Sequence, residues 1–240
     1  MADRPDRHRD RGRRARRTEQ PEKPLMTEPC NVVVLISGSG SNLQALIDSL
    51  NESNPARIRA VISNRAEAFG LQRAQAAGID TRVIDHKQFA DRDAFDAALM
   101  EHIDAYAPQL VVLAGFMRIL TPAFVRHYQG RLLNIHPSLL PRHKGLDTHR
   151  RALEAGDSEH GCSVHFVTEE LDGGPVAIQA AFTVRPEEGI DALTSRVHTA
   201  EHVIYPLAVR WFAEGRLRLC EQGAMLDGAK LPATGHPIRT

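Results

Sequence analysis

The sequence predicts an α/β protein with a Rossmann-like, mostly parallel twisted sheet, helices on both of its faces and a mixed, antiparallel carboxyl-terminal half. Three observations support this fold class. From residue 31 onward, short apolar runs alternate with amphipathic stretches, as βα units on a parallel sheet do. A Gly-rich turn follows the first apolar run. Beyond residue 160, GCSVHFVTEEL alternates apolar and polar residues, a pattern typical of antiparallel strands.

The first half of the chain follows this βα pattern closely. Gly78 stands where a helix C-terminal cap belongs, and Pro108 ends the third amphipathic stretch, because proline disfavours helix in the residue before it. The predicted strands cover 31–36, 58–64, 81–85 and 110–116, and the predicted helices cover about 42–50, 68–77 and 91–106.

The second half is less regular. The segment 131–138 runs apolar into Pro137, so a strand is expected there that ends where Asn134 and His136 emerge. Segments 161–171 and 176–184 form a hairpin-like pair around the turn Asp172-Gly173-Gly174-Pro175. A long helix is expected over about 189–213, kinked or interrupted near Pro206. In the tail, Asp227-Gly228 is a strong hairpin signal.

Two parts are expected in the domain organisation, with residues 1–30 as a disordered, Arg-rich extension and residues 31–240 as a single domain. The extension alternates Arg with Asp and Pro and offers little to bury. A mitochondrial transit peptide is the alternative, but interspersed acids, the absence of serine and the lack of an apolar helical face argue against it. A start at Met26, just ahead of the first strand, is a further hypothesis.

Composition narrows the functional classes. The 240 residues carry equal numbers of basic and acidic side chains, so nucleic acid and anionic membrane surfaces are disfavoured as partners. Three widely spaced cysteines fit neither a disulfide framework nor a zinc site and indicate a cytoplasmic protein. Apolar runs fall short of the roughly 20 residues that span a bilayer. The expected state is a monomer or a homodimer.

The Gly-rich segment SGSGSN (37–42) lies between a predicted strand and a predicted helix. Loop amides and the helix N-terminus would there favour an anion. The dinucleotide fingerprint needs a glycine where Leu43 stands, and the ATP-binding loop needs a Gly-Lys-Ser or Gly-Lys-Thr triplet that the chain lacks. The segment therefore indicates a monophosphate site at Gly40, Ser41 and Asn42, the alternative being a tight turn with a polar cap.

The catalytic candidates come from the strand that ends at Pro137. Asn134 and His136 are two residues apart, so their side chains share one face at the carboxyl end of the strand. An amide donor beside an imidazole can stabilise an oxyanion and supply a proton, as acyl transfer requires. The alternative is that His136 is an ordinary core or surface residue. Asp172 would join them only if the fold brings it close, in which case its carboxylate would favour the imidazolium.

Four motifs, SGSGSNLQALI, AGFMRIL, LNIHPSLLP and GCSVHFVTEELDGGP, occur in an order and spacing that resemble the folate-dependent phosphoribosylglycinamide formyltransferase family from about Asn31 to the carboxyl end. This resemblance implies transfer of a formyl group from 10-formyltetrahydrofolate to the amine of glycinamide ribonucleotide in purine biosynthesis, without a metal or a covalent intermediate. It makes Asn134, His136 and Asp172 the catalytic set. One departure is Asp147, where bacterial members often have His.

The resemblance also implies two binding regions. The ribonucleotide would be held by Gly40, Ser41 and Asn42 at its phosphate and by Glu201 near its ribose. The implied folate contacts are Arg92, Met117, Arg118, Ile119, Leu120, Asn134 and the loop 168–172.

Other interpretations stay open at this level. His198 and His202 flank Glu201 at a spacing that can bind zinc, but a third ligand is missing, so a helix face lining the substrate cleft is the simpler interpretation. Transfer RNA formyltransferases share an LNxHPSLLP-like segment but carry a further carboxyl-terminal domain. Formyltetrahydrofolate hydrolases share the catalytic trio but usually carry an amino-terminal regulatory domain. A non-catalytic module that binds a phosphate ligand is the third alternative.

Overall fold

The computed structural model describes residues 28–50 and 54–239. The predicted extension lies almost wholly outside the described residues, as does Met26. The main sheet has eight strands in the order β11-β7-β6-β5-β4-β1-β2-β3. Its strands are β1 (Cys30–Ile36), β2 (Ala56–Ser63), β3 (Asp80–Val83), β4 (Leu110–Leu113), β5 (Leu132–His136), β6 (Glu159–Phe166), β7 (Val176–Thr183) and β11 (His236–Arg239). Strand β6 runs antiparallel to β5 and β7, and the other pairs are parallel.

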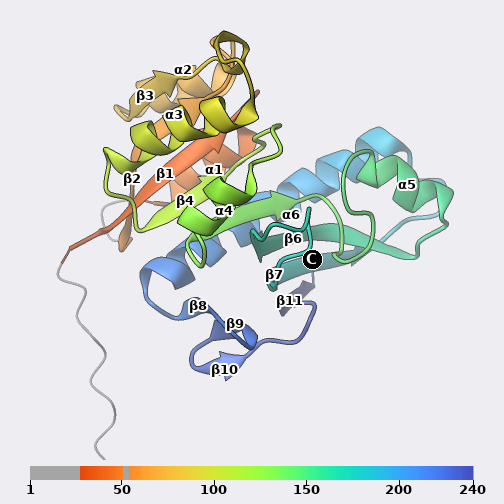
Figure 1. Ribbon diagram of the computed structural model, residues 1–240. Helices are drawn as coiled ribbons and strands as arrows, with labels where there is room; N and C mark the ends of the chain where they lie inside the picture. Colours follow the sequence, from red (N-terminus) through yellow and green to blue (C-terminus); the bar gives the residue numbers. More distant parts are fainter. Residues whose placement is uncertain (1–27, 51–53, 240) are drawn as a thin grey trace, which may run out of the picture.

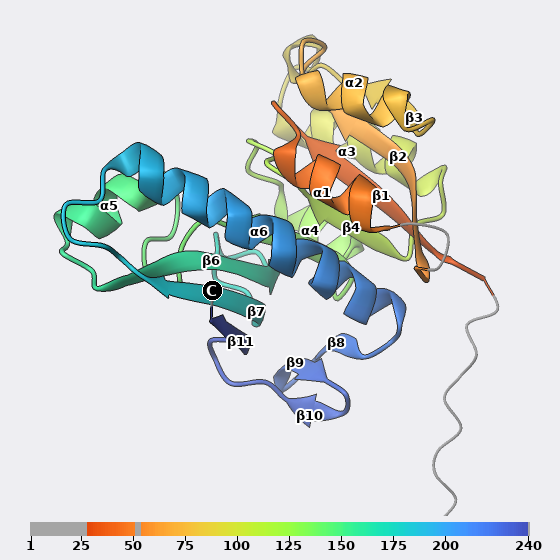
Figure 2. The same cartoon turned by 180° about the vertical axis from the view of Figure 1, so that it is seen from behind.

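Helices cover both faces of this sheet. Figure 1 shows α3 and α4 in front of it, and Figure 2 shows α1 and α6 on the opposite side. The α-helices are α1 (Ser41–Ser49), α2 (Phe69–Ala76), α3 (Arg92–Asp104), α4 (Pro122–His127), α5 (Thr148–Glu154) and α6 (Ile190–Ala213), with a short 3-10 helix at His86–Gln88. A small antiparallel sheet of β8 (Leu217–Cys220), β9 (Gly223–Leu226) and β10 (Ala229–Lys230) follows α6. The predicted fold class is confirmed.

Strand β1 shows why both faces are covered. It is apolar at consecutive positions, and successive side chains in a strand point to opposite faces. Val32, Val34 and Ile36 accordingly pack in one core cluster with α1, α2 and α6. Val33 and Leu35 pack in a second cluster with α3 and α4.

Several details differ from the sequence prediction. Helices α4 and α5 and the parallel strand β11 were not predicted. Helix α6 is one continuous 24-residue helix that contains Pro206, so the prediction of an interruption there is wrong. The Asp227-Gly228 hairpin is present between β9 and β10, with positive φ angles at both turn residues, as its turn type requires.

Helix α6 is tied to the sheet by one buried phenol. The Tyr205 hydroxyl lies 2.9 Å from the carbonyl oxygen of Leu113 and 3.1 Å from that of Leu133. These carbonyls belong to neighbouring strands, β4 and β5. The contact fixes α6 against the centre of the sheet.

The strand order places the predicted site regions together. Strands β5, β4 and β1 are adjacent and parallel. The chain leaves the carboxyl ends of β1, β4 and β5 at Ser37, Ala114 and Pro137, respectively. Ligands in open α/β sheets bind at this edge, where the order of the strands reverses. Among the helices within residues 28–50 and 54–239, none combines the length and the hydrophobicity that a membrane crossing needs.

Candidate active site

The Gly-rich loop between β1 and α1 has a conformation that depends on glycine. Gly40 has a φ of +70°, and a Cβ atom added to it would lie 2.6 Å from the Cα atom of Gly70. Any other residue would therefore be strained and would push α2 away. Helix α1 begins directly after Gly40 without a side-chain cap, so the amides of its first turn face the carboxyl edge of the sheet and favour an anion.

Asn42 and Glu201 meet although 159 residues separate them. The Asn42 Nδ2 atom donates to the Glu201 Oε2 atom at 2.9 Å. Both side chains are buried, and burial raises the pKa of Glu201 above its usual range. Within the described part of the chain, the buried Asn42 Oδ1 atom has no hydrogen-bond partner. A buried acceptor left open in this way fits a site that a polar ligand completes.

The three predicted catalytic side chains also come together. Asn134 and His136 lie on β5, and the loop between β6 and β7 brings Asp172 over them. The His136 Nδ1 atom is 3.4 Å from the Asp172 Oδ2 atom, with only 7 % and 9 % of the two side chains exposed. Asp172 has a φ of +48°, a conformation that aspartate tolerates better than most residues.

His165 is a member of this cluster that the sequence reasoning missed. It lies opposite Asn134 in the antiparallel register of β5 and β6. Its Nδ1 atom is 3.0 Å from the carbonyl oxygen of Phe166, and its Nε2 atom is 3.1 Å from the Asn134 Nδ2 atom and 3.7 Å from the Asp172 Oδ1 atom. Only the register between β5 and β6 could have identified His165, and the sequence does not specify that register.

The protonation state of His165 follows from its surroundings. Burial lowers its pKa to about 4, so the ring is neutral near pH 7. Its Nδ1–H group then donates to the Phe166 carbonyl, and its bare Nε2 atom accepts from the Asn134 amide. This bond orients the Asn134 side chain and leaves one of its two amide hydrogens for a ligand.

The other side of the His136 ring contacts the loop after β5. The His136 Nε2 atom lies 3.0 Å from the carbonyl oxygen of His143, to which it donates. Two residues later, the Gly145 amide donates to the Asp172 Oδ2 atom at 2.9 Å. Segment 143–145 therefore touches both partners of the His136–Asp172 pair.

The predicted folate residues lie beyond β4 and at the start of α3. Met117 and Ile119 are exposed, whereas Leu120 packs against the second core cluster. The Met117 amide donates to the Ser37 Oγ atom at 2.8 Å, which joins this segment to the Gly-rich loop. The Arg118 guanidinium lies over the Phe95 ring, and its buried Nε atom has no partner among the described residues. Arg92 is the first residue of α3.

The His198 and His202 rings stack, with 6.4 Å between their centroids. Among the residues that the structure describes, no group of three or more His, Cys, Asp or Glu side chains could hold a metal ion.

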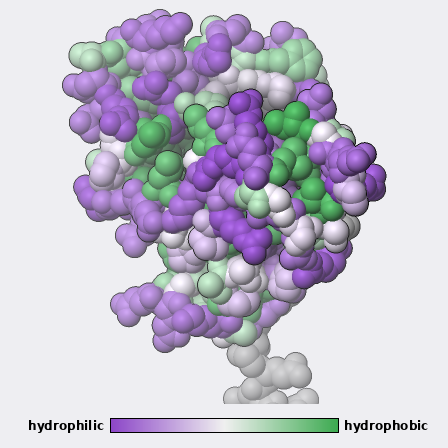
Figure 3. All heavy atoms as spheres, turned by 90° about the vertical axis from the view of Figure 1, so that its right-hand side faces the viewer, coloured by the Kyte–Doolittle hydropathy of each residue, from purple (hydrophilic) through white to green (hydrophobic). Residues whose placement is uncertain are grey.

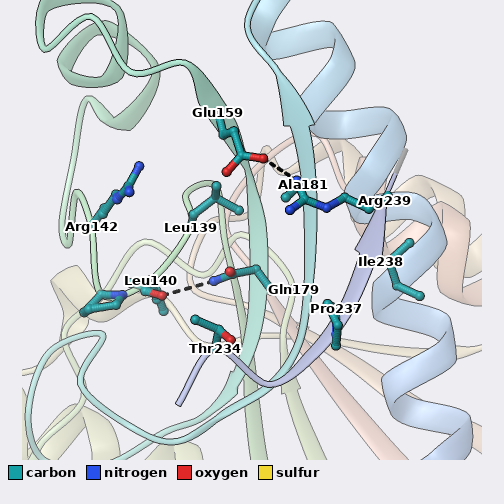
Figure 4. A pocket seen from close by; sticks show the side chains of 11 residues that line it. Leu139, Leu140, Arg142, Glu159, Gln179, Ala181, Thr234, Pro237, Ile238 and Arg239 are labelled. Atoms are coloured by element: carbon teal, nitrogen blue, oxygen red, sulfur yellow. Dashed lines mark hydrogen bonds and ion pairs between the residues drawn. The ribbon is translucent and has the colours of Figure 1, made fainter. Parts of the chain in front are cut away.

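A pocket of about 290 Å³ lies behind the loop that follows β5 (Figure 4). Its walls come from residues 139–142, from β6 and β7, and from the carboxyl-terminal segment that includes β11. The Gln179 Nε2 atom donates to the Leu140 carbonyl at 3.1 Å, and Arg239 pairs with Glu159 (Figure 4). The pocket lies outside the set of predicted site residues, and its walls support the loop. On the face that Figure 3 shows, the right-hand side of Figure 1, hydrophobic residues form separate patches divided by hydrophilic ones.

Comparisons with known proteins place the chain in one family. The formyl transferase family model matches residues 30–209. Phosphoribosylglycinamide formyltransferase of Escherichia coli strain K12 is 59% identical over 207 residues, which cover 86% of this chain and 98% of that protein.

Solved structures show the same likeness. Phosphoribosylglycinamide formyltransferase from Coxiella burnetii superposes with a TM-score of 0.85 at 53% identity, covering 88% of this chain and 99% of that one. Glycinamide ribonucleotide transformylase 1 from Symbiobacterium toebii gives a TM-score of 0.80 at 46% identity, covering 82% and 94%. The chain therefore belongs to the formyl transferase family, among the phosphoribosylglycinamide formyltransferases.

Proposed function

We propose that the chain transfers the formyl group of 10-formyltetrahydrofolate to the amine of 5-phosphoribosylglycinamide in purine biosynthesis, with Asn134, His136 and Asp172 acting on the formyl group. One observation carries the assignment of these residues: an amide, an imidazole and a carboxylate from β5 and from the β6–β7 loop converge at the carboxyl edge of the sheet, with His136 and Asp172 3.4 Å apart.

The chemical step needs stabilisation of negative charge. As the substrate amine attacks the formyl carbon, a carbon–nitrogen bond forms and charge grows on the formyl oxygen. The free Nδ2–H of Asn134 donates to this oxygen. The Nε2–H of His136 now donates to the His143 carbonyl; the formyl oxygen, an acceptor of the same kind, takes over this bond. Donors fixed before the reaction stabilise the charge most effectively.

Asp172 supports the proton transfers. Its carboxylate lies 3.4 Å from the Nδ1 atom of His136 and holds the ring so that the Nε2–H group is directed at the formyl oxygen. It also orients a water molecule that carries a proton from the attacking amine to the leaving folate nitrogen. The bond from the formyl carbon to that nitrogen then breaks, and neither a covalent enzyme intermediate nor a metal ion is needed.

The binding regions follow the same edge. Gly40, Ser41 and Asn42 hold the phosphate of the ribonucleotide through backbone amides at the start of α1, and Glu201 contacts its ribose. The open Asn42 Oδ1 atom is an acceptor, and a hydroxyl of the same ribose can donate to it. The folate lies along Met117, Arg118, Ile119 and Leu120, near Arg92, Asn134 and the loop 168–172. Exposed apolar side chains beside an unpartnered buried guanidinium nitrogen suit a flat ring with polar edges.

The test compares transfer with hydrolysis. Purified protein is incubated with 10-formyltetrahydrofolate in the presence and absence of glycinamide ribonucleotide, and formylated ribonucleotide and free formate are measured. Formyl transfer that depends on the ribonucleotide is expected. Formate release at the same rate without the ribonucleotide would instead favour a hydrolase, and turnover in neither assay would favour a non-catalytic binding module.

A further inference from the structure

The backbone of segment 143–145 contacts both members of the proposed catalytic pair, His136 and Asp172. Its His143 carbonyl accepts from the His136 Nε2 atom at 3.0 Å, and its Gly145 amide donates to the Asp172 Oδ2 atom at 2.9 Å. These two backbone groups set the plane of the imidazole and the position of the carboxylate.

The start of the loop has its own supports. The Leu140 amide donates to the Ser163 Oγ atom at 3.1 Å, and Gln179 donates to the Leu140 carbonyl (Figure 4). Ser163 in turn donates to the Ser138 carbonyl at 2.6 Å. The Ser138 hydroxyl also donates to the Arg142 carbonyl at 2.7 Å. These bonds hold residues 138–142, but they do not reach the His143 carbonyl.

The backbone at His143 needs an anchor because its conformation is unfavourable. Its φ is +51°, which is uncommon for a residue other than glycine. Its side chain supplies the anchor, since the His143 Nε2 atom donates to the Asp157 Oδ2 atom at 2.7 Å. Only 13 % and 18 % of these side chains are exposed, and the Arg142 Nη1 atom lies 3.9 Å from the same oxygen.

Asp157 is a firm point of attachment. It follows α5, and its amide donates to the Ala152 carbonyl of that helix at 3.1 Å. Other side-chain ties of the segment are exposed: the Arg151 Nη1 atom donates to the Lys144 carbonyl at 2.6 Å, and Lys144 pairs at 2.7 Å with Glu170, whose side chain is 71 % exposed. Exposed pairs of this kind contribute little, whereas a mostly buried hydrogen bond to a charged group contributes more.

We infer that His143 and Asp157 are a positioning pair for the reaction. They hold the backbone of segment 143–145 so that it orients the His136 ring in the free enzyme and keeps Asp172 in place throughout turnover. The inference rests on the proposed roles of His136 and Asp172, and His143 itself does not touch the reacting atoms.

The test uses His143→Ala, His143→Gln and Asp157→Ala, with His127→Ala as the control. His127 makes the same type of contact, from its Nε2 atom to the Asp104 Oδ2 atom at 2.8 Å, at the ends of α4 and α3. Steady-state rates give kcat and both KM values. In free, ¹⁵N-histidine-labelled protein, the Nε2–H signal of His136 reports directly on the ring.

Loss of the pair is expected to lower kcat by roughly 10- to 100-fold, since misplacing catalytic groups by about 1 Å can cost about 10²-fold. His143→Ala and Asp157→Ala should each show this loss, while the KM values stay within about twofold of wild type. A double variant that combines these two substitutions should lose no more kcat than either single variant. The His136 Nε2–H signal should broaden or shift in both. His143→Gln, which keeps a donor at the same number of bonds from Cα, should restore most of kcat, and His127→Ala should match wild type.

Two results would overturn the inference: a His143→Ala variant with wild-type kcat, or one that loses kcat while the His136 signal stays unchanged. His136→Ala separates this failure from that of the proposed function. If His136→Ala keeps wild-type turnover, the proposed role of His136 fails. If His136→Ala is inactive and His143→Ala is not, only the positioning role fails.

Discussion

The two ends of the candidate site differ in how fully their polar side chains are hydrogen-bonded within the protein. At the proposed substrate end, with Gly40, Ser41, Asn42 and Glu201, the Asn42 Oδ1 atom is buried without a partner in the described chain, and burial raises the pKa of Glu201. At the proposed catalytic end, with Asn134, His136 and Asp172, each side chain already has a polar contact, to His165, the His143 carbonyl or the Gly145 amide.

The difference indicates a division of labour. Groups that stabilise a transition state act best when they are fixed in advance, and the catalytic end meets this condition. An acceptor without a partner lowers the stability of the free protein, and a ligand that donates to it recovers this cost as binding energy. Changes at the catalytic end should therefore act on kcat, and changes at the substrate end on KM.

The largest effect is expected for Asp172→Asn. The substitution keeps the shape of the side chain but removes the charge beside the His136 Nδ1 atom. Turnover should fall by about 10²-fold or more, while the KM values for both substrates stay within about twofold. Initial-rate measurements at varied concentrations of each substrate test this prediction; unchanged turnover would remove Asp172 from the catalytic set.

A smaller effect is expected at the substrate end. Asn42→Ala removes both the donor to Glu201 and the open acceptor, and one lost hydrogen bond of about 1.4 kcal/mol corresponds to a roughly tenfold rise in KM for glycinamide ribonucleotide. The value of kcat should change little. Asp48→Ala, a change on the exposed side of α1, is the matched control. An Asn42→Ala variant that loses kcat but keeps its KM would reverse the proposed division.

The two ends should also respond to pH with opposite signs. Burial lowers the pKa of His165 from 6.5 to about 4, so the unfolded chain binds more protons between these values, and stability falls as the pH drops from about 6.5. Burial raises the pKa of Glu201 above 4.5, so its contribution is lost as the pH rises above 4.5. Each effect is at most about 1.4 kcal/mol per pH unit.

Urea unfolding between pH 4.5 and 7.5 measures both contributions. His165→Gln should flatten the decline of stability toward acid, and Glu201→Gln should make that decline steeper by removing the opposing term. Equal slopes in wild type and both variants would show that neither group titrates differently in the folded and unfolded chains.

The smallest expected effect is that of metal removal. The proposed reaction uses only protein groups and a water molecule, so dialysis against a chelator should leave turnover unchanged. Turnover that is lost on chelation and returns with one added divalent cation would contradict the metal-free mechanism.

The sequence indicates the loop of the proposed substrate end more directly than the arrangement of the proposed catalytic end, because local rules govern the loop. The Gly-rich segment after a buried strand indicated an anion site without any tertiary information, and the structure gives Gly40 the positive φ angle that only glycine adopts readily. The contact from Asn42 to Glu201 spans most of the chain, and Glu201 entered only through a resemblance.

The catalytic end depends on strand pairing. Alternation placed Asn134 and His136 on one face, but the position of Asp172 depends on a loop, and that of His165 on the register between β5 and β6. Sequence periodicity does not specify which residue of one strand faces which residue of another. The same reason explains why β11, a parallel strand contributed by the tail, was not predicted, whereas the Asp227-Gly228 hairpin was.

The Tyr205 hydroxyl fixes the distance between the two ends of the candidate site. It holds α6 at the carbonyls of Leu113 and Leu133; Glu201 lies about one turn earlier on the same helix, and Asn134 is the residue after Leu133. A slip of α6 by one turn would move Glu201 by about 5.4 Å and would leave two buried carbonyls without their donor. In the proposed arrangement, Tyr205 therefore sets the distance between the ribose at Glu201 and the formyl carbon at Asn134, although it touches neither.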